Sequence, residues 1–147
     1  MERVASQNKD FKALVNDLNG YLSIVDGEEH DFYNQFNKIE QLTNCLVIFN
    51  DNIPIGCGAL KKFDDKTFEI KRMFVKPSYR GKGIATLILR ELELWSTELN
   101  AFHCVLETGK RMRGAVSFYH KNGYSVIPNY GPYVGIDNSI CFQKELK

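Results

Sequence analysis

The sequence predicts an α/β protein in which helices pack against a mixed β-sheet. Three short runs rich in β-forming residues follow one another between residues 45 and 75, separated by polar turns. Two amphipathic helical segments then alternate with further strand-like runs. The chain has 147 residues, of which 44% are hydrophobic and 25% are charged. These values suit a single domain over residues 1–147.

The N-terminal part contains a short strand and helical segments. Residues 3–5 are predicted as the strand. Apolar residues then recur every three or four positions over residues 11–25, which predicts an amphipathic helix that Asn8 or Asp10 can cap. A second, shorter helix is expected over residues 31–39.

The middle of the chain is predicted as a meander of three strands over residues 45–49, 53–63 and 67–75. Pro77 ends the last of them. The predicted elements that follow are a helix over 84–99, a strand over 102–108, a helix over 112–121, and strands over 124–127 and 139–146. The apolar stripe of the first of these helices leaves Glu93 on its polar side.

Composition excludes several classes of function. The formal net charge is +1, which argues against a broad surface for nucleic acid, so any anion site should be local. No apolar leader or membrane-length segment is visible, and we therefore expect a soluble, cytoplasmic protein without a membrane partner. The four cysteines are far apart and sit among apolar neighbours, which predicts buried free thiols and no metal site.

Two cations and two glycines, Arg80-Gly81-Lys82-Gly83, stand immediately before the most regular predicted helix. A helix N-terminus presents free N–H groups and the positive end of the helix dipole. Glycines let a ligand approach the backbone closely. The turn therefore predicts a phosphate or pyrophosphate site, and the alternative is an ordinary connection with solvated cations.

Two motifs give the chain a family resemblance. "RGKGIA", residues 80–85, fits the signature (Q/R)-x-x-G-x-(G/A). "AVSFYHKNGY", residues 115–124, fits the pattern A-x-x-x-Y-x-K-x-G-(F/Y). With both motifs in this order, the chain resembles the GNAT superfamily of N-acetyltransferases. The resemblance implies a mixed, mostly antiparallel sheet of about six to seven strands with about four helices on both faces.

The resemblance also implies acetyl-CoA as co-substrate and no metal. Its pyrophosphate would bind the backbone of the glycine turn, and its pantetheine arm would pair with the end of the preceding strand. The implied contacts are Met73, Phe74, Val75, Arg80, Gly81, Lys82, Gly83, Ile84, Ala85, Thr86 and Lys121. Met112 stands where the family often has an asparagine, which leaves the cofactor contact at that position open.

Tyr119 aligns with the family tyrosine that protonates the leaving thiolate. A phenol is protonated at pH 7 and can donate its proton. The alternative is a tyrosine packed under the sheet. The N–H group of Phe74 or Val75 is the candidate donor to the oxyanion of a tetrahedral intermediate.

Glu69 is the main candidate for the general base, because some family members carry a glutamate at the matching strand position. Glu107, a water relay, or an exposed ion pair between Glu69 and Lys71 are the alternatives. Strict strand alternation would place Glu69, Lys71, Met73 and Val75 on one face and Ile70, Arg72 and Phe74 on the other. Arg72 needs a partner in such an apolar strand, either Glu107 or a substrate carboxylate.

The acceptor is expected to be a small amine. The protein is expected to be a monomer or a homodimer and to have no nucleic-acid partner. Residues expected on the acceptor side are Tyr33, Arg72, Glu107, Tyr130 and Tyr133. Three alternatives remain at this stage: a protein or peptide N-acetyltransferase, a non-catalytic acyl-CoA-binding regulatory domain, and a nucleotide-binding module.

Overall fold

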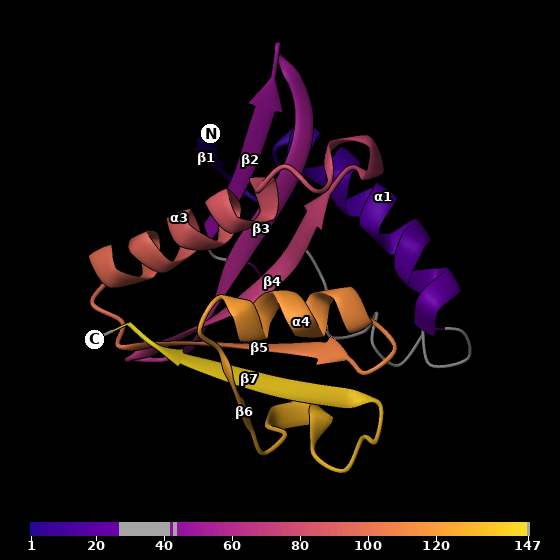
Figure 1. Ribbon diagram of the computed structural model, residues 1–147. Helices are drawn as coiled ribbons and strands as arrows, with labels where there is room; N and C mark the ends of the chain where they lie inside the picture. Colours follow the sequence, from indigo (N-terminus) through magenta and orange to yellow (C-terminus); the bar gives the residue numbers. More distant parts are fainter. Residues whose placement is uncertain (27–41, 43, 147) are drawn as a thin grey trace.

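The computed structural model describes residues 1–26, 42 and 44–146 as one seven-stranded sheet with helices on both faces (Figure 1). The strand order is β1-β2-β3-β4-β5-β7-β6. The strands are β1 (Glu2–Val4), β2 (Asn44–Asn50), β3 (Ile53–Asp64), β4 (Thr67–Val75), β5 (His103–Gly109), β6 (Ser125–Ile127) and β7 (Ser139–Glu145). The α-helices are α1 (Lys9–Asp26), α3 (Ile84–Glu98) and α4 (Arg113–Lys121). The helix expected over residues 31–39 lies outside the described residues.

The predicted meander is confirmed. Strands β1 to β4 pair antiparallel in sequence order. Asp51 and Asn52, with φ of 49° and 66°, make the tight turn between β2 and β3, a left-handed conformation that Asn and Asp tolerate. None of the helices that the structure describes combines the length and apolar character needed to cross a lipid bilayer.

The sheet opens between β4 and its neighbour β5. β4 and β5 run parallel, and their ladder covers Thr67 to Glu69 opposite His103 to Val105. β5 instead pairs along its whole length with β7. The carboxyl ends of β4 and β5 therefore diverge, and Figure 1 shows α4 lying along this side of the sheet. The divergence creates space at the centre of the molecule.

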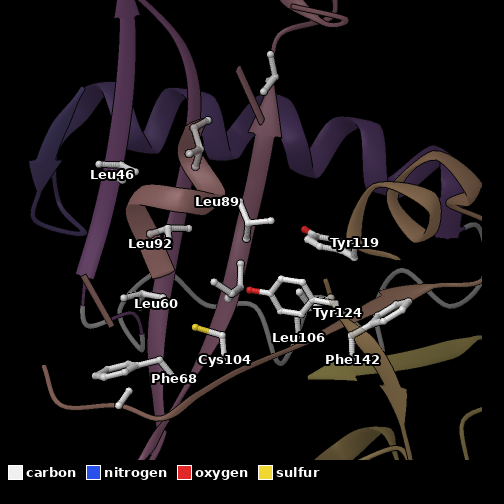
Figure 2. Close-up of a cluster of buried hydrophobic side chains, with 14 residues drawn as sticks. Leu46, Leu60, Phe68, Leu89, Leu92, Cys104, Leu106, Tyr119, Tyr124 and Phe142 are labelled. Atoms are coloured by element: carbon white, nitrogen blue, oxygen red, sulfur yellow. The ribbon is translucent and has the colours of Figure 1, made fainter. Parts of the chain in front are cut away.

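Two hydrophobic clusters hold the helices on opposite faces. Phe11, Leu14 and Val15 of α1 are buried against Val47 and Phe74 of the sheet. On the other face α3 and α4 share a larger cluster with β2, β3 and β5, and Figure 2 shows part of it, including Leu60, Leu89, Leu92 and Tyr119. The expected placement of helices on both faces is confirmed.

The prediction that Glu93 lies on a polar side of α3 is wrong. Its side chain is 8% exposed. The Tyr124 hydroxyl donates to Glu93 Oε2 at 2.9 Å, and Lys144 Nζ donates to Glu93 Oε1 at 3.0 Å. Both partners are remote in sequence, so helical periodicity could not identify a glutamate whose charge is compensated inside the fold.

The strict alternation expected along β4 is also wrong. Ala59 of β3 faces Lys71, but Cys57 faces Phe74, so two steps along β3 match three along β4. Such a β-bulge places two consecutive side chains on one face. Arg72 sits in the bulge with a φ of 57°.

The bulge reverses the faces of the residues that follow it. Met73 and Val75 join the cluster under α3, while Phe74 joins the cluster under α1. Arg72 bonds Asn19 of α1, so its side chain lies on the α1 face rather than among the apolar residues under α3. The bulge thus turns a cation out of the core and toward the central opening.

Candidate active site

The turn between β4 and α3 is built to receive an anion. Gly81 and Gly83 both have a φ of 80°, and Gly83 is the N-cap of α3 without a side-chain cap bond. A Cβ added at either glycine would meet no atom within 4 Å. The first turn of α3 carries no acidic residue. Its N–H groups therefore face open space with an unopposed positive helix end.

The Arg80 side chain ties this turn to the end of β4. Its Nε donates to the Val75 carbonyl at 2.8 Å, and its guanidinium lies 5.6 Å from the centre of the Phe74 ring. Lys82 Nζ lies 5.6 Å from the Tyr79 ring centre. Arg80 and Lys82 are both exposed, so the turn offers an anion two cations beside its backbone N–H groups.

The end of β4 directs backbone groups into the opening. The Lys76 N–H donates to the Ile55 carbonyl of β3 at 2.8 Å. Because backbone groups alternate in direction along a strand, those of Val75 point away from β3. The bond from Arg80 to the Val75 carbonyl agrees with this direction. Of the two oxyanion donors considered, Val75 is the one whose N–H faces the opening.

A pocket of about 130 Å³ lies where β4 and β5 diverge. It brings together residues from α1, β4, β5, α4 and the loop before β7. Its lining residues are Leu18, Leu22, Glu69, Ile70, Lys71, Arg72, Met73, Leu106, Glu107, Thr108, Gly109, Met112, Ala115, Tyr119 and Tyr133. Five residues expected to take part in catalysis or acceptor binding, Glu69, Arg72, Glu107, Tyr119 and Tyr133, therefore share one cavity.

Tyr119 both packs in the core and lines the pocket. Its ring makes edge contacts with Phe118 and Tyr124, with centroids 5.1 and 5.8 Å away, and Figure 2 shows it reaching from α4 over the sheet. Burial raises the pKa of the Tyr119 hydroxyl above its ordinary value. The group is therefore protonated at neutral pH and able to donate.

Glu69 is held by a tyrosine from the loop before β7. The Tyr130 hydroxyl donates to Glu69 Oε2 at 2.8 Å. Burial, reinforced by the Glu69 charge, raises the pKa of Tyr130. The alternative of an exposed ion pair between Glu69 and Lys71 is wrong, since the two residues are 6% and 8% exposed.

Lys71 is the pocket residue that sequence reasoning missed. Its Nζ donates to the Tyr133 hydroxyl at 3.5 Å. Burial lowers the pKa of Lys71, and the nearby carboxylate of Glu69 opposes that change. The signal that could have found it was the one applied to Arg72, namely a cation within an otherwise apolar strand.

Arg72 is a buried cation with an incomplete set of partners. It is 6% exposed, and its Nη2 donates to Asn19 Oδ1. Its Nε is buried and has no hydrogen-bond partner among the residues that the structure describes. Among the residues that the structure describes, Arg72 forms no ion pair, and the bridge to Glu107 considered above is not formed. Burial accordingly lowers the pKa of its guanidinium.

The remaining expected residues lie outside this cavity. Ile84, Ala85 and Thr86 form the first turn of α3 beside the glycines. Lys121 is exposed in the last turn of α4. Tyr33 lies outside the described residues. No group of histidine, cysteine, aspartate or glutamate in the described part of the chain is arranged to hold a metal ion.

Comparison with known proteins relates the chain to acetyltransferases. The model of the acetyltransferase (GNAT) family matches residues 11–124. Over 135 residues the chain is 27% identical to the IAA acetyltransferase of Azospirillum brasilense, a match that covers 90% of this chain and 88% of that protein.

Solved structures share the fold. A protein of Klebsiella pneumoniae assigned as an acyl-CoA N-acyltransferase superposes with a TM-score of 0.83 at 24% identity, over 99% of this chain and 96% of that one. A GNAT family acetyltransferase from Elizabethkingia anophelis, solved with acetyl-CoA bound, gives a TM-score of 0.66 at 20% identity, over 84% of this chain and 87% of that one.

Proposed function

The chain belongs to the acetyltransferase (GNAT) family, and we propose on that premise that it moves the acetyl group of acetyl-CoA directly to the primary amine of a small molecule or amino acid. One observation carries the proposal. The pocket at the divergence of β4 and β5 collects a protonated tyrosine and a buried carboxylate, and β4, which lines it, leads along the chain to the uncapped N-terminus of α3. These are the groups that acyl transfer from a phosphorylated thioester carrier needs.

Acetyl-CoA would bind along the open side of β4. Its pyrophosphate would accept hydrogen bonds from the N–H groups at the start of α3, from Gly83 to Thr86. The pantetheine arm would run past the backbone of Met73 and Val75, in the place that a paired strand would otherwise take. This path ends beside Tyr119, which lines the pocket.

The transfer proceeds through a tetrahedral intermediate. The neutral amine nitrogen attacks the thioester carbon, the C–N bond forms, and the Val75 N–H stabilises the oxyanion. The C–S bond then breaks, and Tyr119 gives its proton to the departing thiolate. The proton lost by the amine goes to Glu69, to Glu107 or to a water, and a proton from solvent restores Tyr119.

Two other functions make different predictions. A protein or peptide N-acetyltransferase would acetylate a lysine side chain or a chain N-terminus, and should turn over peptides in preference to free small amines. A non-catalytic acyl-CoA-binding domain would bind the cofactor without turnover. The presence of Tyr119 and Glu69 in the pocket favours the enzyme. Cytoplasmic location and the choice between monomer and homodimer stay predictions.

Thiol release from acetyl-CoA across a panel of small amines tests the proposal. The four cysteines are buried free thiols, so the native protein should add little to the signal. We expect amine-dependent release of CoA by the wild type. Measured binding of acetyl-CoA without turnover of any amine would overturn the enzyme and favour the regulatory domain.

A further inference from the structure

We propose that the acceptor amine carries a carboxylate, and that Arg72 binds this carboxylate in the pocket between β4 and β5. The inference rests on the proposed function and deepens it by naming the substrate class, an amino acid or a close relative of one. It is carried by three observations on Arg72: its direction, its burial and its incomplete hydrogen bonding.

The direction of Arg72 is set by the β-bulge. In a regular strand Arg72 would point to the same face as Ile70, into the cluster under α3. The bulge instead puts it on the α1 face, at a φ of 57° that non-glycine residues rarely adopt. A left-handed conformation is strained for such a residue. Bulges of this kind often re-aim a side chain at a functional site.

The partner of Arg72 on α1 is a neutral group. Asn19 Oδ1 accepts one bond from Nη2, which satisfies one of the five N–H donors of the guanidinium. Among the described residues Nε finds no hydrogen-bond partner and the guanidinium finds no anion. A buried cation left in this state is costly, so the site favours an anionic ligand. A carboxylate matches the planar guanidinium fork and would accept from Nε and a neighbouring N–H together.

The rest of the pocket wall suits the amine of the same molecule. The charged side chains of Glu69, Lys71, Arg72 and Glu107 all line this one pocket. A molecule with both an amino and a carboxylate group complements such a wall. Its carboxylate would face Arg72 and its amine the glutamates, with the amine toward Tyr119 and the thioester.

Matched acceptors test the inference on the wild type. Each amino acid in the panel is compared with its carboxamide and with the amine that lacks the carboxylate, at one fixed concentration of acetyl-CoA. We expect kcat/KM to be about 10- to 100-fold higher for the carboxylate form, the range of a charged hydrogen bond between buried partners. Equal kcat/KM across each set would overturn the inference while leaving the acetyltransferase in place.

Variants of Arg72 identify the residue responsible. Arg72→Gln should lower kcat/KM for the carboxylate substrates about 10- to 100-fold and leave the carboxamides within a few-fold. Arg72→Lys should recover part of the loss, because it restores charge without the fork. Arg113→Gln, an exposed arginine of α4 outside the pocket, is the matched control and should behave as wild type.

The outcomes separate the two proposals. No turnover of any amine would remove the proposed function itself. A carboxylate preference that persists in Arg72→Gln would overturn the role of Arg72. Circular dichroism and the affinity for acetyl-CoA establish that each variant is folded, and if Arg72→Gln does not fold, the comparison of Arg72→Lys with the wild type decides.

Discussion

Replacing Tyr119 with phenylalanine should separate catalysis from binding and folding. The change deletes one hydroxyl oxygen and keeps the ring, so the contacts with Phe118, Tyr124 and Phe142 at 5.1, 5.8 and 6.1 Å remain. Loss of a general acid slows a reaction about 10²- to 10⁴-fold. That corresponds to about 3–5 kcal/mol of activation free energy. The affinity for acetyl-CoA should stay within about twofold of the wild type, because the hydroxyl acts on the leaving sulfur.

Tyr124→Phe provides the contrasting variant. The Tyr124 hydroxyl donates to Glu93 Oε2 at 2.9 Å in the core and does not line the pocket. Its removal leaves a buried carboxylate with one bond fewer, at a cost of about 1–3 kcal/mol in the free energy of unfolding. Its kcat should stay within a few-fold of the wild type. Tyr119→Phe should thus lower mainly the rate, and Tyr124→Phe should lower mainly the stability.

Steady-state thiol release at saturating acetyl-CoA, with thermal unfolding as the second measurement, checks both variants. The alkaline side of the wild-type profile adds a third. Because burial raises the pKa of Tyr119, kcat should not fall through loss of its proton until the pH exceeds about 10, the ordinary value for tyrosine. An unchanged kcat in Tyr119→Phe, with the variant folded, would refute the acid role.

Three further predictions concern the turn, the base and alkaline stability. Gly83→Ala should lower the free energy of unfolding by about 1–2 kcal/mol, because alanine is disfavoured at a φ of 80°. Calorimetry should show that this variant binds acetyl-CoA about tenfold more weakly than the wild type. The control Gly20→Ala, where a Cβ has free space in α1, should instead raise the melting temperature. Glu69→Gln should lower kcat about 100-fold or more with little change in acetyl-CoA affinity, and wild-type activity would assign the base to Glu107 or water. Burial raises the pKa of Tyr130 above its unfolded value, so the stability that Tyr130 contributes is complete below pH about 10 and is lost at about 1.4 kcal/mol per pH unit above it. Denaturant titrations at alkaline pH should show that the free energy of unfolding falls less steeply with pH in Tyr130→Phe than in the wild type. Identical slopes would contradict the assignment of this loss to Tyr130.

Local sequence patterns were sufficient for the elements that form the proposed cofactor side of the site. β4 spans Thr67–Val75 as predicted, and α3 begins at Ile84 directly after the glycine turn. Both depend on signals within a few residues, such as Pro77 after the strand and the positive φ that only glycine adopts readily at positions 81 and 83. The cradle could therefore be predicted from its own residues.

The acceptor side depended on tertiary contacts that no local pattern contains. The bulge at Arg72 arises where Gly58 of the neighbouring strand lies against α3, with Ile88 and Leu92 side chains 2.8 Å from the position of an added Cβ. A period of two along β4 cannot reveal this change of register. Lys71, by contrast, carried a local signal, a cation within an otherwise apolar strand, and only its contact with Tyr133 depends on the tertiary fold.

Product analysis of one complete reaction distinguishes direct acetyl transfer to the amine from hydrolysis of acetyl-CoA. The purified protein is incubated with acetyl-CoA and an amino acid acceptor, and both products are quantified by mass spectrometry. Direct transfer predicts one N-acetylated amine for each CoA released, with neither product formed when the amine is omitted. Release of CoA with free acetate, or release that does not depend on the amine, would contradict acetyl transfer in the pocket between β4 and β5.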